Sequence, residues 1–114
     1  MDRIKDELIS KINLSDIEAQ IFLFLIHNGK TPLANVSVAL NLSPEKTVDL
    51  LHSLIEKGLI LELSGQYQTF HPKFSIINAY RLFCQRKDIE FKKNIQIDNL
   101  ASSLERIYDT ARTK

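Results

Sequence analysis

The sequence predicts a mainly α-helical fold with one small β-hairpin, and three observations support this prediction. Apolar residues recur at helical spacing along most of the 114 residues. Residues 59–70 instead alternate apolar and polar positions around a two-residue Ser64-Gly65 turn, which is typical of a tight hairpin. All three glycines and all three prolines lie between these segments, so they mark the element boundaries.

Two helices are predicted before the first glycine. Within residues 1–13, four apolar residues share one face of an amphipathic helix: Ile4, Leu8, Ile9 and Ile12. Ser15 and Glu18 then form a capping box ahead of six consecutive large apolar residues, 21–26. A helix that is apolar on every side is expected at the centre of a small helical core, and Gly29 ends this one.

A third helix, a fourth helix and the hairpin follow in that order. Apolar residues at i, i+3 and i+7 after Pro32 predict a short helix. Ser43 is a suitable N-cap and Pro44 suits the first helical position, so the next helix is predicted over residues 44–57. This order is typical of a winged helix-turn-helix, in which residues 44–57 form the recognition helix and the hairpin, residues 59–71, forms the wing.

The segment after Pro72 is predicted to be a long helical tail. It has no glycine or proline, and its apolar stripe slips in phase between Gln85 and Ile97, so a kink or break near 86–96 is expected. An apolar stripe on so long a helix needs a partner, and we expect a dimerisation segment. Its candidate contacts are Ile77, Tyr80, Cys84, Phe91, Ile97, Leu100, Leu104 and Ile107. The alternative is that two helices fold back on the winged body.

The chain thus divides into an N-terminal helix (1–13), a winged domain (14–72) and a tail (73–114). Residues 1–72 carry 6 Lys and Arg against 9 Asp and Glu, a net charge of −3, and residues 73–114 carry 9 against 5, a net charge of +4. The charged start is unlike a signal peptide and no apolar run is long enough to span a membrane. We therefore expect a cytoplasmic protein without a membrane partner.

Catalytic or metal-binding residues are not predicted. The three histidines, His27, His52 and His71, are far apart, and none has a cysteine or carboxylate at metal-ligand spacing. The single cysteine, Cys84, lies on the apolar stripe of the tail and is expected to pack as a small apolar residue. No glycine-rich phosphate loop is present, so the sequence predicts neither an enzyme nor a cofactor.

Two blocks and one glycine carry a resemblance to a known family: Leu14-Ser15-Asp16-Ile17-Glu18-Ala19, Gly29, and Leu51-His52-Ser53-Leu54-Ile55-Glu56-Lys57-Gly58-Leu59-Ile60. Through them, residues 14–72 resemble the N-terminal domain of archaeal TrmB-type transcriptional regulators. The tail is similar to the helical dimerisation segment that follows this domain. The resemblance implies a homodimer that binds double-stranded DNA, with helix 44–57 in the major groove and wing 59–71 on the backbone.

The candidate DNA contacts are polar residues of the third helix start, the recognition helix and the wing: Lys30, Thr31, Ser43, Lys46, Asp49, His52, Ser53, Gln66 and Tyr67. Members of the family commonly carry arginines at positions matching Pro44, Lys46 and His52, and only Lys46 keeps a full positive charge here. The acidic winged domain therefore favours an alternative function, a protein–protein interaction module that binds another transcription-related protein without contacting DNA directly.

Overall fold

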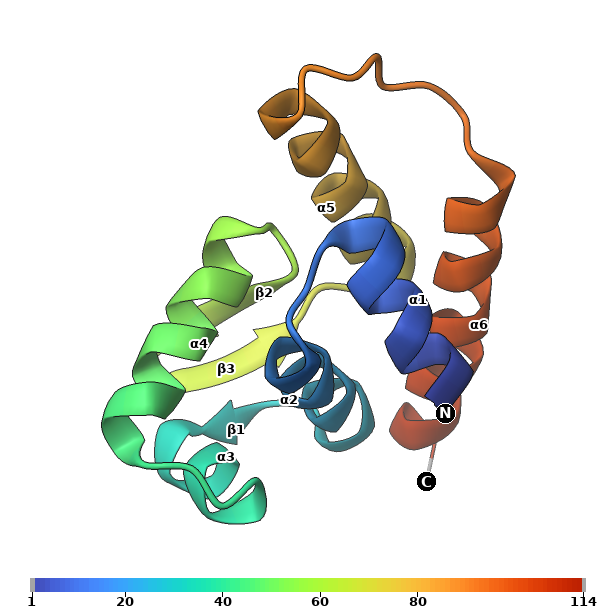
Figure 1. Cartoon of the computed structure of the whole chain (residues 1–114). Helices are drawn as coiled ribbons and strands as arrows, with labels where there is room; N and C mark the ends of the chain where they lie inside the picture. Colours follow the sequence, from blue (N-terminus) through green and yellow to red (C-terminus); the bar gives the residue numbers. More distant parts are fainter. Residues whose placement is uncertain (1, 114) are drawn as a thin grey trace.

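The structure is a computed structural model that describes residues 2–113. The described part of the chain forms six helices and a small sheet, arranged as in Figure 1. The elements in chain order are α1 (Asp2–Ile12), α2 (Asp16–Asn28), β1 (Thr31–Pro32), α3 (Leu33–Ala39), α4 (Pro44–Glu56), β2 (Ile60–Leu63), β3 (Gln66–Thr69), α5 (Pro72–Arg86) and α6 (Ile95–Arg112). The predicted mainly helical fold with a small hairpin is confirmed.

Side-chain caps define the starts of α2 and α4, as predicted. The Ser15 Oγ accepts a hydrogen bond of 3.1 Å from the Glu18 backbone N–H, and the Glu18 carboxylate accepts one of 2.8 Å from the Ser15 N–H. This reciprocal pair is the capping box. Ser43 caps α4 through a 3.2 Å hydrogen bond from the Lys46 N–H, and Pro44 follows at the first helical position.

The predicted hairpin is present, and the sheet contains one strand more than the sequence predicted. The strand order is β1-β3-β2 with both pairings antiparallel, and Thr31 of β1 lies opposite Tyr67 of β3. Ser64 and Gly65 connect β2 to β3 with φ angles of 54° and 80°. Two positive φ values fit a type I′ turn, which matches the natural twist of a hairpin. β1 was not predicted because two residues show no periodicity.

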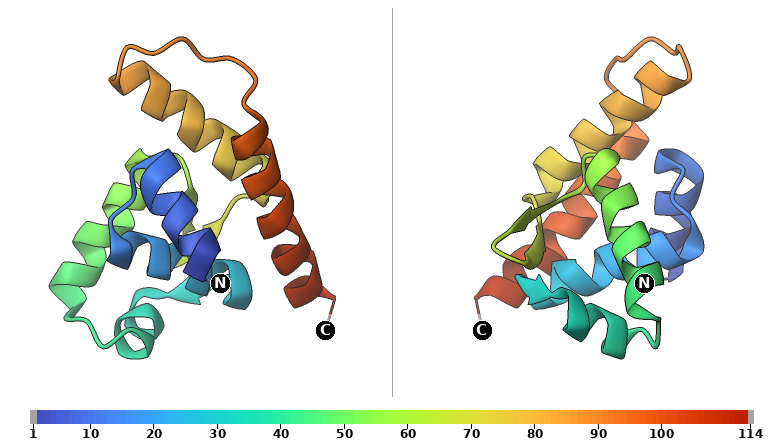
Figure 2. Two further views of the ribbon diagram at one scale, coloured as in Figure 1. Left: turned by 45° about the vertical axis from the view of Figure 1, so that its right-hand side comes forward. Right: turned by 90° about the vertical axis from the view of Figure 1, so that its left-hand side faces the viewer.

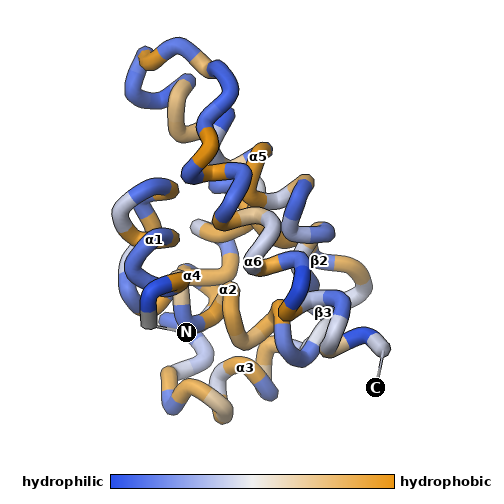
Figure 3. The backbone as a smooth tube through the Cα atoms, turned by 90° about the vertical axis from the view of Figure 1, so that its right-hand side faces the viewer, coloured by the Kyte–Doolittle hydropathy of each residue, from blue (hydrophilic) through white to orange (hydrophobic). Residues whose placement is uncertain are grey.

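Helix α2 lies at the centre of the core, as its continuous apolar run predicts. Its side chains Ile21, Phe22, Leu25 and Ile26 are fully buried. The helix contacts α1, α4, α6 and β3, which cover most of its apolar side chains. In Figure 3 the segment labelled α2 is largely hydrophobic and lies near the middle of the molecule.

The tail breaks where the phase of its apolar stripe slips, and α6 then folds back along α5 (Figures 1 and 2). Residues 87–94 form the connection, which contains Asp88 at a positive φ of 55°. Contacts of α6 with α5, α2 and α1 cover its apolar face, so the structure shows the fold-back alternative. None of the helices within residues 2–113 is long and apolar enough to cross a membrane.

This fold-back corrects the expectation of an uncovered apolar stripe. Four of the candidate dimer contacts are buried within the same chain: Cys84, Ile97, Leu100 and Leu104. Three others are partly buried against the core or on its edge: Ile77, Tyr80 and Ile107. Only Phe91 of the set is exposed. The apolar stripe of the tail is therefore covered by helices of the same chain.

Candidate nucleic-acid interface

A small polar network holds the turn between α3 and α4. The buried Ser37 hydroxyl, on α3, donates a 2.7 Å hydrogen bond to the Leu42 carbonyl in the turn. The fully buried Thr47 hydroxyl donates to the Ser43 carbonyl at 2.8 Å and lies 3.4 Å from the Ser37 hydroxyl. Because buried polar atoms require partners, this arrangement favours one geometry of the two helices. The N-terminal half of α4 is thereby fixed against α3.

Glu18 holds the C-terminal half of α4 against the start of α2. Its side chain accepts hydrogen bonds from the Lys57 ammonium at 2.7 Å and from the Ser53 hydroxyl. Lys57 donates a second bond of 3.2 Å to the Asn13 carbonyl. Burial acts to raise the pKa of Glu18, but Lys57, the Ser15 amide and Ser53 together outweigh it, so the pKa lies below its usual value. The carboxylate is charged and paired.

The outward face of α4 carries mixed charge. Glu45, Lys46, Asp49, His52 and Glu56 are all exposed, as expected from their positions outside the apolar stripe. Lys46 is the one permanent cation among these five residues. The opposite face, with Leu51 and Leu54, is buried in the core. The helix therefore exposes a polar face while its apolar face packs in the core. The exposed face has little positive charge.

Three of the candidate contacts have other roles in the structure. Thr31 is buried, and its hydroxyl donates a 2.8 Å hydrogen bond to the Gly29 carbonyl. Tyr67 is buried in the core, and burial followed by the charge of Glu62 raises the pKa of its phenol. Ser53 is half-buried and bound to Glu18. Because these side chains are engaged within the fold, we do not count them among the direct contacts with DNA.

The remaining candidates are accessible in the described structure. Lys30, Ser43, Lys46, Asp49 and His52 are exposed, and Gln66 in the wing is half-buried. Ser43 uses its hydroxyl oxygen to cap α4. An acidic group lies at the exposed wing tip. There the Glu62 carboxylate accepts a 3.1 Å hydrogen bond from the Gly65 N–H.

The cations of the tail gather away from α3. Arg86, Lys87, Lys92 and Lys93 are exposed at the end of α5 and in the connection, which extends from the far end of the molecule in Figures 1 and 2. Lys93 lies 3.5 Å from Asp98 at the start of α6. The positive charge of these four residues is therefore separate from the helix-turn-helix.

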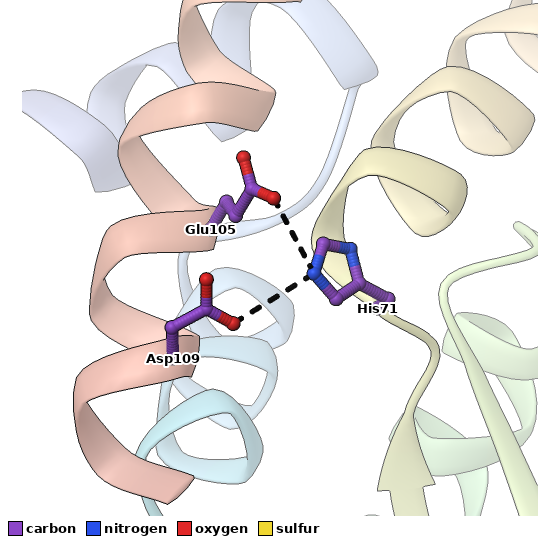
Figure 4. Close-up of side chains that lie close together, drawn as sticks. All are labelled: His71, Glu105 and Asp109. Carbon is purple, nitrogen blue, oxygen red and sulfur yellow. Dashed lines mark ion pairs between the residues drawn. The ribbon is translucent and has the colours of Figure 1, made fainter. Parts of the chain in front are cut away.

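The structure also brings together residues that the sequence did not connect. His71 was expected at the end of a strand, but it is the N-cap of α5 and faces α6. Its Nε2 lies 3.6 Å from a Glu105 carboxylate oxygen and 3.8 Å from one of Asp109 (Figure 4). The fold-back of α6 creates this cluster, and the only local signal was the i, i+4 spacing of the two acids. His27 and His52 are exposed elsewhere.

A helix-turn-helix whose second helix is followed by a β-hairpin defines this chain as a winged helix-turn-helix protein. Residues 8–74 match the family described as the sugar-specific transcriptional regulator TrmB. This match covers more than half of the chain, from within α1 to the start of α5. The chain belongs to the TrmB family of transcriptional regulators.

A solved structure shows the same fold over nearly the whole chain. The protein is TrmBL2, described as an archaeal chromatin protein that shows a novel mode of DNA binding. The TM-score is 0.64 at 18% sequence identity, and the alignment covers 98% of this chain and 42% of TrmBL2. The chain thus spans less than half the length of that protein. No curated protein sequence gave a significant match.

Proposed function

We propose that this protein is a DNA-binding transcriptional regulator that presents the exposed face of α4 to the major groove. The observation that carries the proposal is that α4 has a fixed position and an exposed polar face. Hydrogen bonds of Thr47 and Glu18 hold its two halves, and the polar face is exposed to solvent. Such an arrangement is expected of a recognition helix, because its side chains must meet base edges in a defined register. Membership of the TrmB family supports the proposal.

The exposed residues suggest distinct roles at the DNA. We assign Lys46, in the first turn of α4, to a phosphate or a guanine edge, and His52 to a base edge. We assign Asp49 to a cytosine amine, from which its carboxylate would accept a hydrogen bond that offsets its repulsion from phosphates. Lys30 precedes α3, and Gln66 lies in the wing, so both are assigned to the backbone.

Substitution of Lys46 tests this assignment directly. We expect Lys46→Ala to weaken binding to all duplexes and to reduce the slope of log affinity against log salt by about 1, as for loss of one phosphate contact. Arg3→Ala is the matched control, because it removes one exposed cation from α1. Equal affinities and slopes for Lys46→Ala and wild type would remove Lys46 from the interface.

We also propose that the regulator is a homodimer, through residues other than the buried stripe. The connection and the start of α6 expose three large apolar side chains close together in sequence, Ile89, Phe91 and Ile95. Apolar side chains of this size at the surface are typical of interfaces between proteins. Two copies joined here would each carry one helix-turn-helix, as dimeric readers of paired half-sites do.

The mixed charge of α4 favours a second candidate function, a protein interaction module. Glu45, Asp49 and Glu56 would repel phosphates, and a basic protein surface would instead attract them. This function predicts no measurable binding to duplex DNA at low salt. Both candidate functions use the exposed face of α4. Titration of duplex DNA at low salt separates them, because only the first function predicts binding.

A further inference from the structure

His71, Glu105 and Asp109 converge from two distant parts of the chain. His71 lies between β3 and α5, and both acids lie on one face of α6, one helical turn apart (Figure 4). One ligand atom from each residue can be chosen so that the three lie within 4.8 Å of one another. The cluster therefore bridges the end of the winged domain and the last helix.

The geometry points to a binding site for a divalent transition-metal ion, with Zn²⁺ as its first candidate. Zinc is held by histidine nitrogen and carboxylate oxygen at about 2.0–2.2 Å, which places ligand atoms roughly 3–3.5 Å apart around one ion. The separations of 3.6 and 3.8 Å between His71 and the two acids are slightly longer, and all three ligand atoms lie within 4.8 Å of one another, so side-chain rotations would have to bring them closer around an ion. Three protein ligands leave a fourth position for water, as in open zinc sites.

The donor set decides the class of ion. An imidazole nitrogen suits zinc and other late transition metals, whereas magnesium and calcium prefer sites made of oxygen alone. The two carboxylates supply two negative charges to balance the ion. In the metal-free chain, part of this charge faces Lys73, whose ammonium lies 3.6 Å from Glu105. That lysine is largely exposed and would turn into solvent when the ion enters.

The surroundings of His71 allow the imidazole to act as a ligand. Its Nδ1 accepts a 3.3 Å hydrogen bond from the Lys73 N–H, so the neutral ring carries its proton on Nε2, toward the acids. When Nε2 binds a metal, the ring proton moves to Nδ1 and the Lys73 N–H bonds to water instead. Tyr108 packs against the ring edge-on with centroids 5.1 Å apart, which limits rotation in either state.

The three side chains are exposed enough for an ion to reach them from solvent. A bound ion would link α6 to the winged domain. The side chains of His71, Glu105 and Asp109 are 41%, 28% and 59% exposed, so an ion can enter from solvent. An ion that binds only the folded chain stabilises it by mass action. Zinc would therefore raise the unfolding temperature and hold α6 in place against the β3–α5 junction.

Isothermal titration of Zn²⁺ into the untagged full-length chain at neutral pH tests the proposal. We expect one ion per chain at micromolar zinc, with a higher unfolding temperature in its presence. His71→Asn and Glu105→Gln should each weaken binding by more than the roughly 10- to 100-fold typical of losing an outer-shell partner. Asparagine is itself a good N-cap, so His71→Asn should preserve the start of α5.

Two control variants separate this site from general metal binding. His52→Asn removes an exposed histidine of α4, and Glu90→Gln removes an exposed acid of the connection. Both should bind zinc as wild type does. If wild type binds no zinc, or if His71→Asn binds as tightly as wild type, the cluster is only a set of ion pairs between the two segments and the proposal is wrong. Asp109→Asn gives the same comparison should Glu105→Gln fold poorly.

Discussion

At the residue scale, Glu18 stabilises both the start of its own helix and the packing of α4 against that helix. Its carboxylate completes the capping box of α2, and it also accepts hydrogen bonds from Ser53 and Lys57, which orient α4. The capping box was predicted because it depends on two residues three positions apart. The bonds to α4 were not, because no local pattern relates residue 18 to residues 53 and 57.

Glu18→Gln should destabilise the protein in a pH-dependent way. A carboxyl whose folded pKa is lowered stabilises the fold above its unfolded pKa, near the ordinary value of 4.5, and this stabilisation is lost as the pH falls through the folded pKa. We expect a loss of about 2 kcal/mol at pH 7, less than the roughly 3–5 kcal/mol for outright removal of one partner from a buried ion pair.

Chemical denaturation of both proteins between pH 7 and pH 3 checks this prediction. The difference in unfolding free energy between wild type and Glu18→Gln should narrow below about pH 4.5, where the wild-type carboxyl begins to lose its advantage. Glu7→Gln is the control, since its ion pair with Arg3 is at the surface and contributes little. A difference that stays constant with pH would show that the charge of Glu18 is not what stabilises α4.

Two glycines with nearly the same backbone geometry should respond differently to alanine. Gly58 and Gly65 have φ angles of 81° and 80°, so alanine costs about 1–2 kcal/mol of backbone strain at each. At Gly58 a Cβ would also overlap the Asn78 side chain and lie 2.8 Å from Leu82 of α5, whereas at Gly65 it would meet nothing within 4 Å. Thermal unfolding should therefore show a larger loss for Gly58→Ala, and equal losses would contradict the close approach of α5.

At the element scale, we expect the acidic side chains on α4 to weaken the proposed binding to DNA. If this face approaches phosphates, Glu45→Gln with Asp49→Asn should strengthen binding at low salt by removing repulsion. Because Asp49 is assigned to a cytosine amine, the double variant should also discriminate less between sequences. Titration of labelled duplexes of two sequences measures both effects. Unchanged affinity would indicate that α4 faces away from the DNA.

Elements defined by local signals were predictable, and those defined by distant contacts were not. Ser15 and Ser43 marked the correct starts of α2 and α4. Ser64-Gly65 marked the turn of the hairpin. Strand β1 and the docking of α6 depend on pairings between residues far apart in sequence. In the candidate site, the alternation of β3 places Tyr67 on the buried face with Thr69, so the burial of Tyr67 was predictable from the sequence.

At the scale of the whole molecule, the fold-back of α6 changes which surface can join two copies. Sedimentation velocity of the wild type at micromolar concentration should show a dimer, and the variant with Ile89→Asp and Ile95→Asp should be a monomer because charged groups replace its apolar contact. The control Val38→Asp changes an exposed apolar residue of α3 and should leave the dimer intact. A monomeric wild type would contradict the proposed dimer.

The proposed function requires this winged domain to bind duplex DNA despite its net negative charge. Fluorescence anisotropy of a labelled mixed-sequence duplex, titrated at about 50 mM and about 200 mM salt, tests it most directly. Each neutralised phosphate adds about 0.9 to the salt slope, so two contacts already predict an affinity roughly tenfold lower at the higher salt. Salt-sensitive binding is the result that the proposed function predicts. Absence of binding at low salt would contradict it and favour a protein partner for α4.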